Sequence, residues 1–246
     1  MPSPRPQFLL LQVRNLDDPM REQEVGCFAT ALGCPADSID THDLLSGPPP
    51  RHRLSAYAAV LLGGSGDYSV AAGGEWLEPV LDAMRQLHEM GKPTFASCWG
   101  FQALARALGG RVVTDLSRAE LGTIELELTE AGLADPVLGI LPPRFIGHAG
   151  HQDIVDTLPA GAIRLARSDR VEYQAFTFPG KPIYCTQFHP ELTRRAFLER
   201  LEQYPSYVER IVGCSLERFA AGVRETPEAN RLLRRFVQVV LDSELA

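Results

Sequence analysis

Short apolar runs alternate with stretches of helical spacing along the first half of the chain. The runs that predict strands cover residues 7–14, 38–44, 57–62 and 93–98. The stretches that predict helices cover residues 18–32, 75–90 and 99–108, and each is followed by a glycine. The run 57–62 is apolar throughout, as expected of a strand that is covered on both faces. The alternation predicts an open, mostly parallel sheet flanked by helices.

The second half of the chain has a different pattern, with closely spaced strand candidates. These cover residues 111–114, 122–129, 144–147, 163–168, 173–178 and 183–188. Such spacing favours antiparallel or mixed strands added to the same sheet. From residue 193 to 243 the pattern is helical and predicts two or three helices, with breaks at Pro205 and Pro227. We expect one domain over residues 1–246, with a core at about 8–192 and C-terminal helices at 193–246.

Composition and charge narrow the classes of function. The hydrophobic content of 45% is enough for a packed core. The net charge is −7 and no cluster of Lys and Arg stands out, so no nucleic-acid partner is expected. The longest apolar runs, such as 8–11 and 56–62, are far shorter than the roughly 20 residues that span a bilayer, so no membrane segment is expected. A small-molecule substrate or another protein remains as the expected partner.

The cysteines and the first residues bear on location. The opening Met-Pro-Ser-Pro-Arg-Pro has no apolar stretch of the kind that directs export. Five cysteines, an odd number without metal-ligand spacing, predict free thiols in a reducing compartment. We therefore expect a cytoplasmic protein without a metal or other cofactor.

Cys98 lies in the stretch PTFASCWGFQ, between a predicted strand and a predicted helix. The first N–H groups of a helix and its dipole favour a thiolate at such a junction. A sharp strand-to-helix turn also requires small residues two positions before and after the nucleophile, and here these are Ala96 and Gly100. The local pattern fits a nucleophile and a buried structural cysteine equally well.

Two further segments follow predicted strands and could complete a site. In QFHPE, His189 and Glu191 supply a base and a carboxylate that could orient it. In GGSG, the glycines at 63, 64 and 66 let the backbone approach a ligand and direct N–H groups at an oxyanion. Each motif is weak alone. Their shared position after strands of a parallel sheet is where ligand sites gather.

The three segments in this order resemble the class I, triad-type glutamine amidotransferases, over about residues 8–192. The similarity extends to stand-alone members that are like the amidotransferase half of GMP synthetase. The resemblance implies a flavodoxin-like α/β fold. It also implies that Cys98 is the nucleophile, that His189 is the general base and acid, and that Glu191 orients His189.

The resemblance implies further contacts to the substrate. The backbone N–H groups of Gly64 and Trp99 would form the oxyanion hole. Gln102 matches a position that helps to hold the glutamine side of the substrate. Gly150 and His151 begin a segment similar to the family's Ser-His-Gly-Asp, whose backbone lines the substrate pocket.

The chain departs from the family pattern at several positions. Ala96 and Ser97 stand where the family commonly has Gly and Ile or Val, and Gln152 replaces a glycine. We expect activity to survive the alanine, whereas Gln152 could narrow the end of the pocket that takes the amino-acid group. His148 and His151 are spaced like metal ligands, but a pocket-lining loop is the favoured interpretation because no further ligand cluster is evident.

These features lead to two hypotheses of different kinds. In the first, the protein hydrolyses the γ-glutamyl amide of glutamine or of a γ-glutamyl conjugate through a glutamyl thioester. Because the residues after Leu192 are too few for a synthetase domain, ammonia from glutamine would pass to a separate synthetase. In the second, the protein is a non-catalytic regulator that keeps the pocket. The loops at 67–74 and 170–181 are expected to set selectivity.

Overall fold

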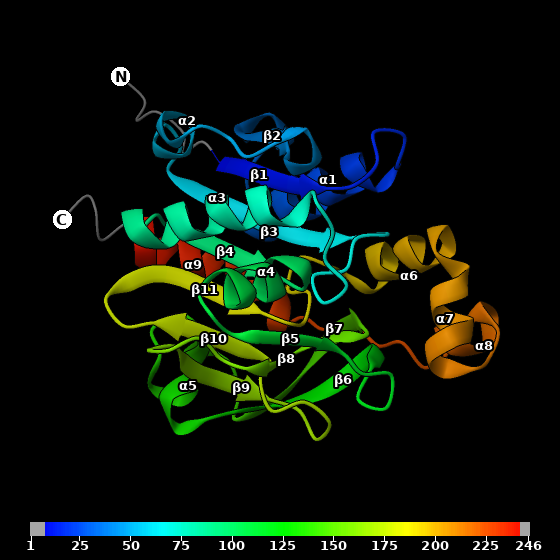
Figure 1. The fold of residues 1–246 in the computed structure, drawn as a ribbon. Helices are drawn as coiled ribbons and strands as arrows, with labels where there is room; N and C mark the ends of the chain where they lie inside the picture. Colours follow the sequence, from blue (N-terminus) through cyan, green and yellow to red (C-terminus); the bar gives the residue numbers. More distant parts are fainter. Residues whose placement is uncertain (1–7, 242–246) are drawn as a thin grey trace.

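The computed structural model describes residues 8–241, and its centre is a nine-stranded sheet (Figure 1). The strand order is β2-β1-β3-β4-β11-β10-β9-β6-β7. The first five of these strands pair in parallel, and the remaining neighbours pair antiparallel. In this order the strands are Ile39–Asp43, Phe8–Val13, Ala59–Ser65, Thr94–Ser97, Lys181–Thr186, Ala175–Phe178, Ile163–Arg167, Glu120–Leu128 and Arg144–His151. The mixed α/β class predicted from the sequence is confirmed.

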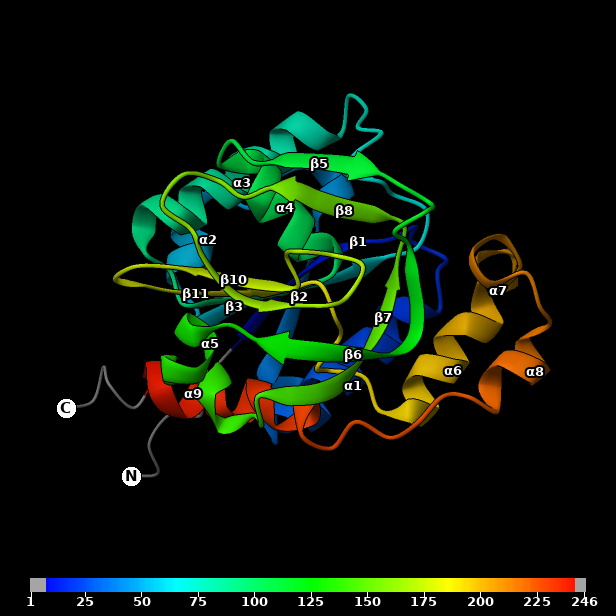
Figure 2. The ribbon, with the colours of Figure 1, turned by 90° about the horizontal axis from the view of Figure 1, so that it is seen from below.

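Helices cover both faces of the sheet. Figure 2 shows α3 and α4 on one side, and α1 and α9 on the other. From α1 to α9 the helices are Met20–Leu32, Arg51–Ser55, Leu77–Met90, Trp99–Ala107, Glu130–Ala134, Arg194–Gln203, Pro205–Val212, Leu216–Ala220 and Leu232–Leu241. None of the helices within residues 8–241 is long and apolar enough to cross a bilayer.

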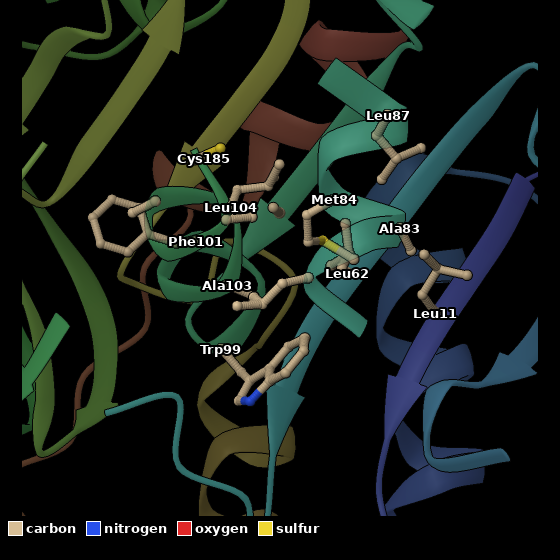
Figure 3. Close-up of a cluster of buried hydrophobic side chains, with 14 of the residues drawn as sticks. Leu11, Leu62, Ala83, Met84, Leu87, Trp99, Phe101, Ala103, Leu104 and Cys185 are labelled. Atoms are coloured by element: carbon tan, nitrogen blue, oxygen red, sulfur yellow. The ribbon is translucent and has the colours of Figure 1, made fainter. Parts of the chain in front are cut away.

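Alternate residues of the parallel strands supply two separate cores. In β1, Leu9 and Leu11 face the α3 and α4 side, whereas Phe8 and Leu10 face the α1 and α9 side. Figure 3 shows the first core, in which Leu11 and Leu62 of the sheet lie near Met84 of α3 and Leu104 of α4. Burial on both faces explains why the strands read as continuous apolar runs.

Several predicted boundaries and one placement differ from the structure. The strand predicted over 57–62 begins later and runs through Gly63 and Gly64 to Ser65, because pairing with β1 resumes at Ser65 after an irregularity in the register. The prediction that all second-half strands join one sheet is wrong. β5 (Arg111–Thr114) pairs with β8 (Asp153–Thr157) in a separate two-stranded sheet, and the sequence pattern missed β8. Gln7, in the first predicted strand, lies outside the described residues.

The C-terminal segment divides into two parts. Four helices, rather than two or three, lie between residues 193 and 241. α6, α7 and α8 project beyond the edge of the sheet at which β3 ends (Figure 1). α9 returns to the sheet, where Phe236 is fully buried against the rings of Phe95 and Tyr184 at centroid distances of 5.5 and 5.9 Å. The chain after residue 192 thus contributes to the second core.

Replacing Phe236 by alanine tests whether α9 and the sheet unfold as one unit, as the expected single domain requires. Phe236→Ala leaves a cavity in the second core, and we expect it to lower the free energy of unfolding by about 3–5 kcal/mol in urea denaturation followed by circular dichroism. Leu16→Ala is the control, because Leu16 is 81% exposed, and it should change the value by less than about 0.5 kcal/mol. Equal stability of the two variants would contradict a shared core.

Candidate functional site

Three adjacent parallel strands bring the sequence motifs together. β4 lies between β3 and β11 and pairs in parallel with both, so the carboxyl ends of all three strands meet at one edge of the sheet. Cys98 follows β4, Gly64 is the next-to-last residue of β3, and His189 follows β11. Residues far apart in the sequence therefore meet at the position where open α/β sheets bind ligands.

Cys98 occupies a strained turn between β4 and α4. Its backbone angles are φ 51° and ψ −100°. Among residues 8–241 it is the one non-glycine residue with a positive φ. Such a backbone conformation costs on the order of 1–3 kcal/mol and persists only where the surroundings enforce it. The Cys98 N–H donates to Thr186 O at 2.8 Å, which ties the turn to β11. The sharp turn predicted from the sequence is present.

The small residues around Cys98 are required by close packing. A Cβ built on Gly100 would lie 2.5 Å from the Leu62 Cβ and 3.2 Å from the Ala96 Cβ. Ala96 itself is fully buried against the first core. Alanine therefore fits two positions before Cys98, whereas two positions after it only glycine leaves room for β3.

His189 and Glu191 form a buried pair. The Nδ1 of His189 and the Oε1 of Glu191 are 2.7 Å apart, and the two side chains are 5% and 0% exposed. Burial lowers the pKa of His189, but the charges of Glu191 and Cys98 outweigh it and raise the pKa to about 9. Burial likewise raises the pKa of Glu191, while His189 and Arg200 outweigh it and hold this pKa below its ordinary value. Near neutral pH the pair is thus an imidazolium and a carboxylate.

Gly64 and Trp99, the two residues expected to form an oxyanion hole, both line cavities that Cys98 also lines. Trp99 is the first residue of α4, so its N–H has no acceptor within the helix. A Cβ on Gly64 would lie 3.2 Å from the His189 Cε1 and 3.8 Å from guanidinium nitrogens of Arg14 and Arg200. A side chain at position 64 would therefore crowd His189, which accounts for a glycine there.

Two cavities are lined in part by Cys98. The larger one has a volume of about 240 Å³, and its lining includes Cys98, Trp99, Gln102, Gly150, Gln152 and Arg210. The smaller one has about 60 Å³ and lies between Cys98, His189, Phe197 and Tyr204. A substrate bound at Cys98 thus has space in both cavities.

Gln102 and Asp153 brace the larger cavity. Gln102 is buried and its Nε2 donates to Asp153 O at 2.8 Å and to Gln187 Oε1 at 3.2 Å. The Asp153 carboxylate accepts from Ser69 and Thr114 hydroxyls, each at 2.6 Å. These bonds fix the loop after β3 to the β5-β8 sheet. Of the two loops expected to set selectivity, the segment 67–74 lines the cavity, and the segment 170–181 does not.

The segment that contains His148 and His151 is a strand rather than the predicted loop, because it pairs with β6 over its whole length. The Gly150 O lies 3.8 Å from the Cys98 Sγ, so the backbone of β7 reaches the site. The His151 side chain is buried and its Nε2 lies 3.1 Å from Glu120 Oε2. His148 stacks on Phe197, and burial lowers its pKa to about 4. Within residues 8–241, no cluster of three or more His, Cys, Asp or Glu side chains is arranged to hold a metal ion.

Side chains from α6, from α7, from the residue between these helices and from the residue after β1 also line the site. Tyr204, Tyr207 and Arg210 border the larger cavity, and Arg14 and Arg200 border the smaller one. The sequence reasoning missed all five. Arg14 alone carried a signal, since a charged residue directly after a mostly apolar strand is placed at the same sheet edge as the motifs.

Comparisons with known proteins find a matching family model, related sequences and similar structures. The family model for glutamine amidotransferase class-I matches residues 34–203. The chain is 37% identical over 127 residues to one subunit of the glutamine-hydrolyzing GMP synthase of Methanosarcina acetivorans, a match that covers 52% of this chain and 65% of that relative. It therefore spans just under two thirds of that relative's length.

Two other relatives match over nearly the whole chain. Gamma-glutamyl peptidase 4 of Arabidopsis thaliana is 26% identical over 225 residues, which cover 87% of this chain and 83% of the relative. The crystal structure of a glutamine amidotransferase from Thermotoga maritima superposes with a TM-score of 0.75 at 23% identity, covering 96% of this chain and 98% of that one. The structural likeness confirms the fold.

A methyl group at position 100 tests the packing behind Cys98. Gly100→Ala forces the α4 backbone away from Leu62, and we expect a loss of about 1–3 kcal/mol in the free energy of unfolding, measured by urea denaturation. Gly26→Ala is the matched control in helix α1, because no atom lies within 4 Å of its added Cβ. The control should gain about 0.5–1 kcal/mol from helix propensity. A Gly100→Ala variant as stable as the wild type would refute the packing argument.

Proposed function

The chain belongs to the class I glutamine amidotransferase family, and from that membership we propose that it cleaves the γ-glutamyl amide bond of glutamine or of a γ-glutamyl conjugate with a Cys98–His189–Glu191 triad. The observation that carries the proposal is the strained Cys98 turn beside the buried His189–Glu191 pair. In this pair the His189 Nδ1 and the Glu191 Oε1 are 2.7 Å apart. The positive φ of Cys98 and the buried charges of His189 and Glu191 each lower the stability of the fold, which supports a role in chemistry.

The proposed reaction begins with attack of the Cys98 thiolate on the γ-carbonyl carbon. A C–S bond forms, and the oxyanion accepts hydrogen bonds from the Gly64 and Trp99 N–H groups. His189 then donates its proton to the departing nitrogen, the C–N bond breaks, and ammonia or an amine leaves. Because the charge of Cys98 helps to raise the pKa of His189, loss of that charge in the thioester favours release of the proton.

The second half of the proposed reaction regenerates the enzyme. Neutral His189 takes a proton from water, and the resulting hydroxide attacks the thioester. The C–S bond breaks, glutamate leaves, and the thiolate and imidazolium form again. Glu191 stays ionised throughout and accepts a hydrogen bond from the Nδ1–H of His189.

The larger cavity suits the γ-glutamyl group. Its volume of about 240 Å³ and its polar lining, which includes Gln102 and Gln152, support binding of a small zwitterion. His189 lines the smaller cavity instead, so the leaving group would depart on that side. Gln152, which we expected to narrow the amino-acid end, borders the larger cavity and is half-buried.

The leaving group distinguishes two versions of the proposed function. The similarity to gamma-glutamyl peptidase 4 covers 87% of this chain, which supports hydrolysis of a conjugate as the whole reaction. The similarity to the glutamine-hydrolyzing GMP synthase supports the second candidate, a glutaminase that passes ammonia to a separate synthetase. A regulator without turnover is the remaining alternative, and the intact triad positions weigh against it.

Assays with glutamine and a panel of γ-glutamyl dipeptides test the proposal. We expect the purified chain to release glutamate, and Cys98→Ala to lose at least about a thousandfold in rate because the nucleophile is absent. Cys34→Ala, at a half-buried cysteine after α1, is the control and should match the wild type. No release from any compound, or a fully active Cys98→Ala variant, would refute the hydrolase. Ammonia release that requires added cell extract would favour the second candidate.

A further inference from the structure

Arg200 lies beside Glu191 of the proposed triad, on a helix that follows the sequence motifs. It lies on α6, and only 8% of the residue is exposed. Its Nη1 is 3.8 Å from the Glu191 Oε1, and its Nε donates to Gln23 Oε1 at 3.2 Å. Within residues 8–241, neither Nη1 nor Nη2 has a hydrogen-bond acceptor, and the Glu191 Oε2 has no donor. The guanidinium and the carboxylate therefore lie close together in a buried region, with no hydrogen bond between them.

Burial makes the charge of Glu191 expensive unless another charge compensates it. His189 can do so only while it is an imidazolium. We propose that Arg200 is a positioning residue of this site, whose permanent charge compensates buried Glu191 and keeps its carboxylate ionised and turned toward His189. This inference rests on the proposed function, in which His189 must change its charge in every cycle.

The other charged groups near Arg200 are already accounted for. Arg14 pairs with Glu24 and Asp18, and its Nη1 also donates to the Tyr204 hydroxyl. Arg194 donates to the backbone oxygens of Val223 and Ala220, and Glu199 pairs with exposed Arg195. Burial keeps the Cys27 thiol protonated by raising its pKa to about 11, and His148 is neutral because its pKa is lowered to about 4. The charge of Arg200 therefore acts mainly on Glu191.

A charge count over the proposed cycle shows what Arg200 contributes. In the reactive state that the proposed cycle starts from, the charges of the thiolate, imidazolium, carboxylate and guanidinium sum to zero. In the thioester, Cys98 and His189 are both neutral, and Glu191 and Arg200 still cancel. Without Arg200 the thioester state would leave a lone buried carboxylate beside His189. His189 would then hold its proton more tightly, which slows both proton delivery to the leaving group and activation of water.

Titration of His189 by NMR tests the inference without any substrate. We expect Arg200→Met to move the titration midpoint of His189 upward, on the order of one pH unit relative to the wild type measured alongside. Arg200→Lys keeps the positive charge and should titrate near the wild type. Arg195→Met, on the same helix with a side chain 88% exposed, should also match the wild type. An unchanged midpoint in folded Arg200→Met would overturn the inference.

Kinetics provide a second readout once a substrate is known. Arg200→Met should lower kcat on the order of tenfold to a hundredfold and leave KM nearly unchanged, since Arg200 acts through Glu191. Arg200→Lys should recover most of the loss. A loss confined to KM, or no recovery with lysine, would overturn the inference. A wild type that hydrolyses nothing would instead refute the proposed function, while the NMR titration would still decide the role of Arg200.

A double variant covers the case in which Arg200→Met is too unstable to study. Glu191→Gln combined with Arg200→Met removes both buried charges, so we expect it to be more stable than Arg200→Met alone in thermal denaturation. If Arg200 served only to pack α6, the double variant would be no more stable than the single one. That result would overturn charge compensation.

Discussion

The parallel pairing of β3, β4 and β11 is the constraint on which the site depends. These strands are neighbours in the sheet and run in the same direction, so Gly64, Cys98 and His189 leave the sheet at one edge. The register is enforced from both faces, because alternate residues of each strand belong to the two apolar cores. A shift of one residue would turn Phe95 and Ala96 to the wrong faces and would move Cys98 with them.

Energy gained in the cores sustains two unfavourable features at that edge. One is the positive φ of Cys98, which requires Gly100 to lie against Leu62. The other is a buried carboxylate at Glu191, which is balanced by His189 and, in our proposal, by Arg200. The C-terminal helices therefore serve the site twice: α6 brings Arg200 behind it, and Tyr204 and Tyr207 border the cavities beside it.

The sequence predicted most of the fold because buried parallel strands read as apolar runs and their helices end at glycines. It located Cys98, His189 and Glu191 through motifs that follow strands. It missed β8, whose residues 153–157 alternate too briefly to be recognised, and it assigned His148 and His151 to a loop although β6 pairs with them. Arg200 and Tyr207 could not be found, because only the tertiary placement of α6 and α7 beyond the sheet edge brings them near Cys98.

The central claim is that Cys98 forms a covalent bond to a γ-glutamyl group, and rapid acid quenching during turnover followed by mass spectrometry tests it most directly. The claim predicts a mass increase of one glutamyl group on the peptide that contains Cys98. The increase should be larger in Glu191→Gln if His189 then activates water more slowly. Steady hydrolysis with no adduct on Cys98, or with the adduct on another cysteine, would contradict the claim.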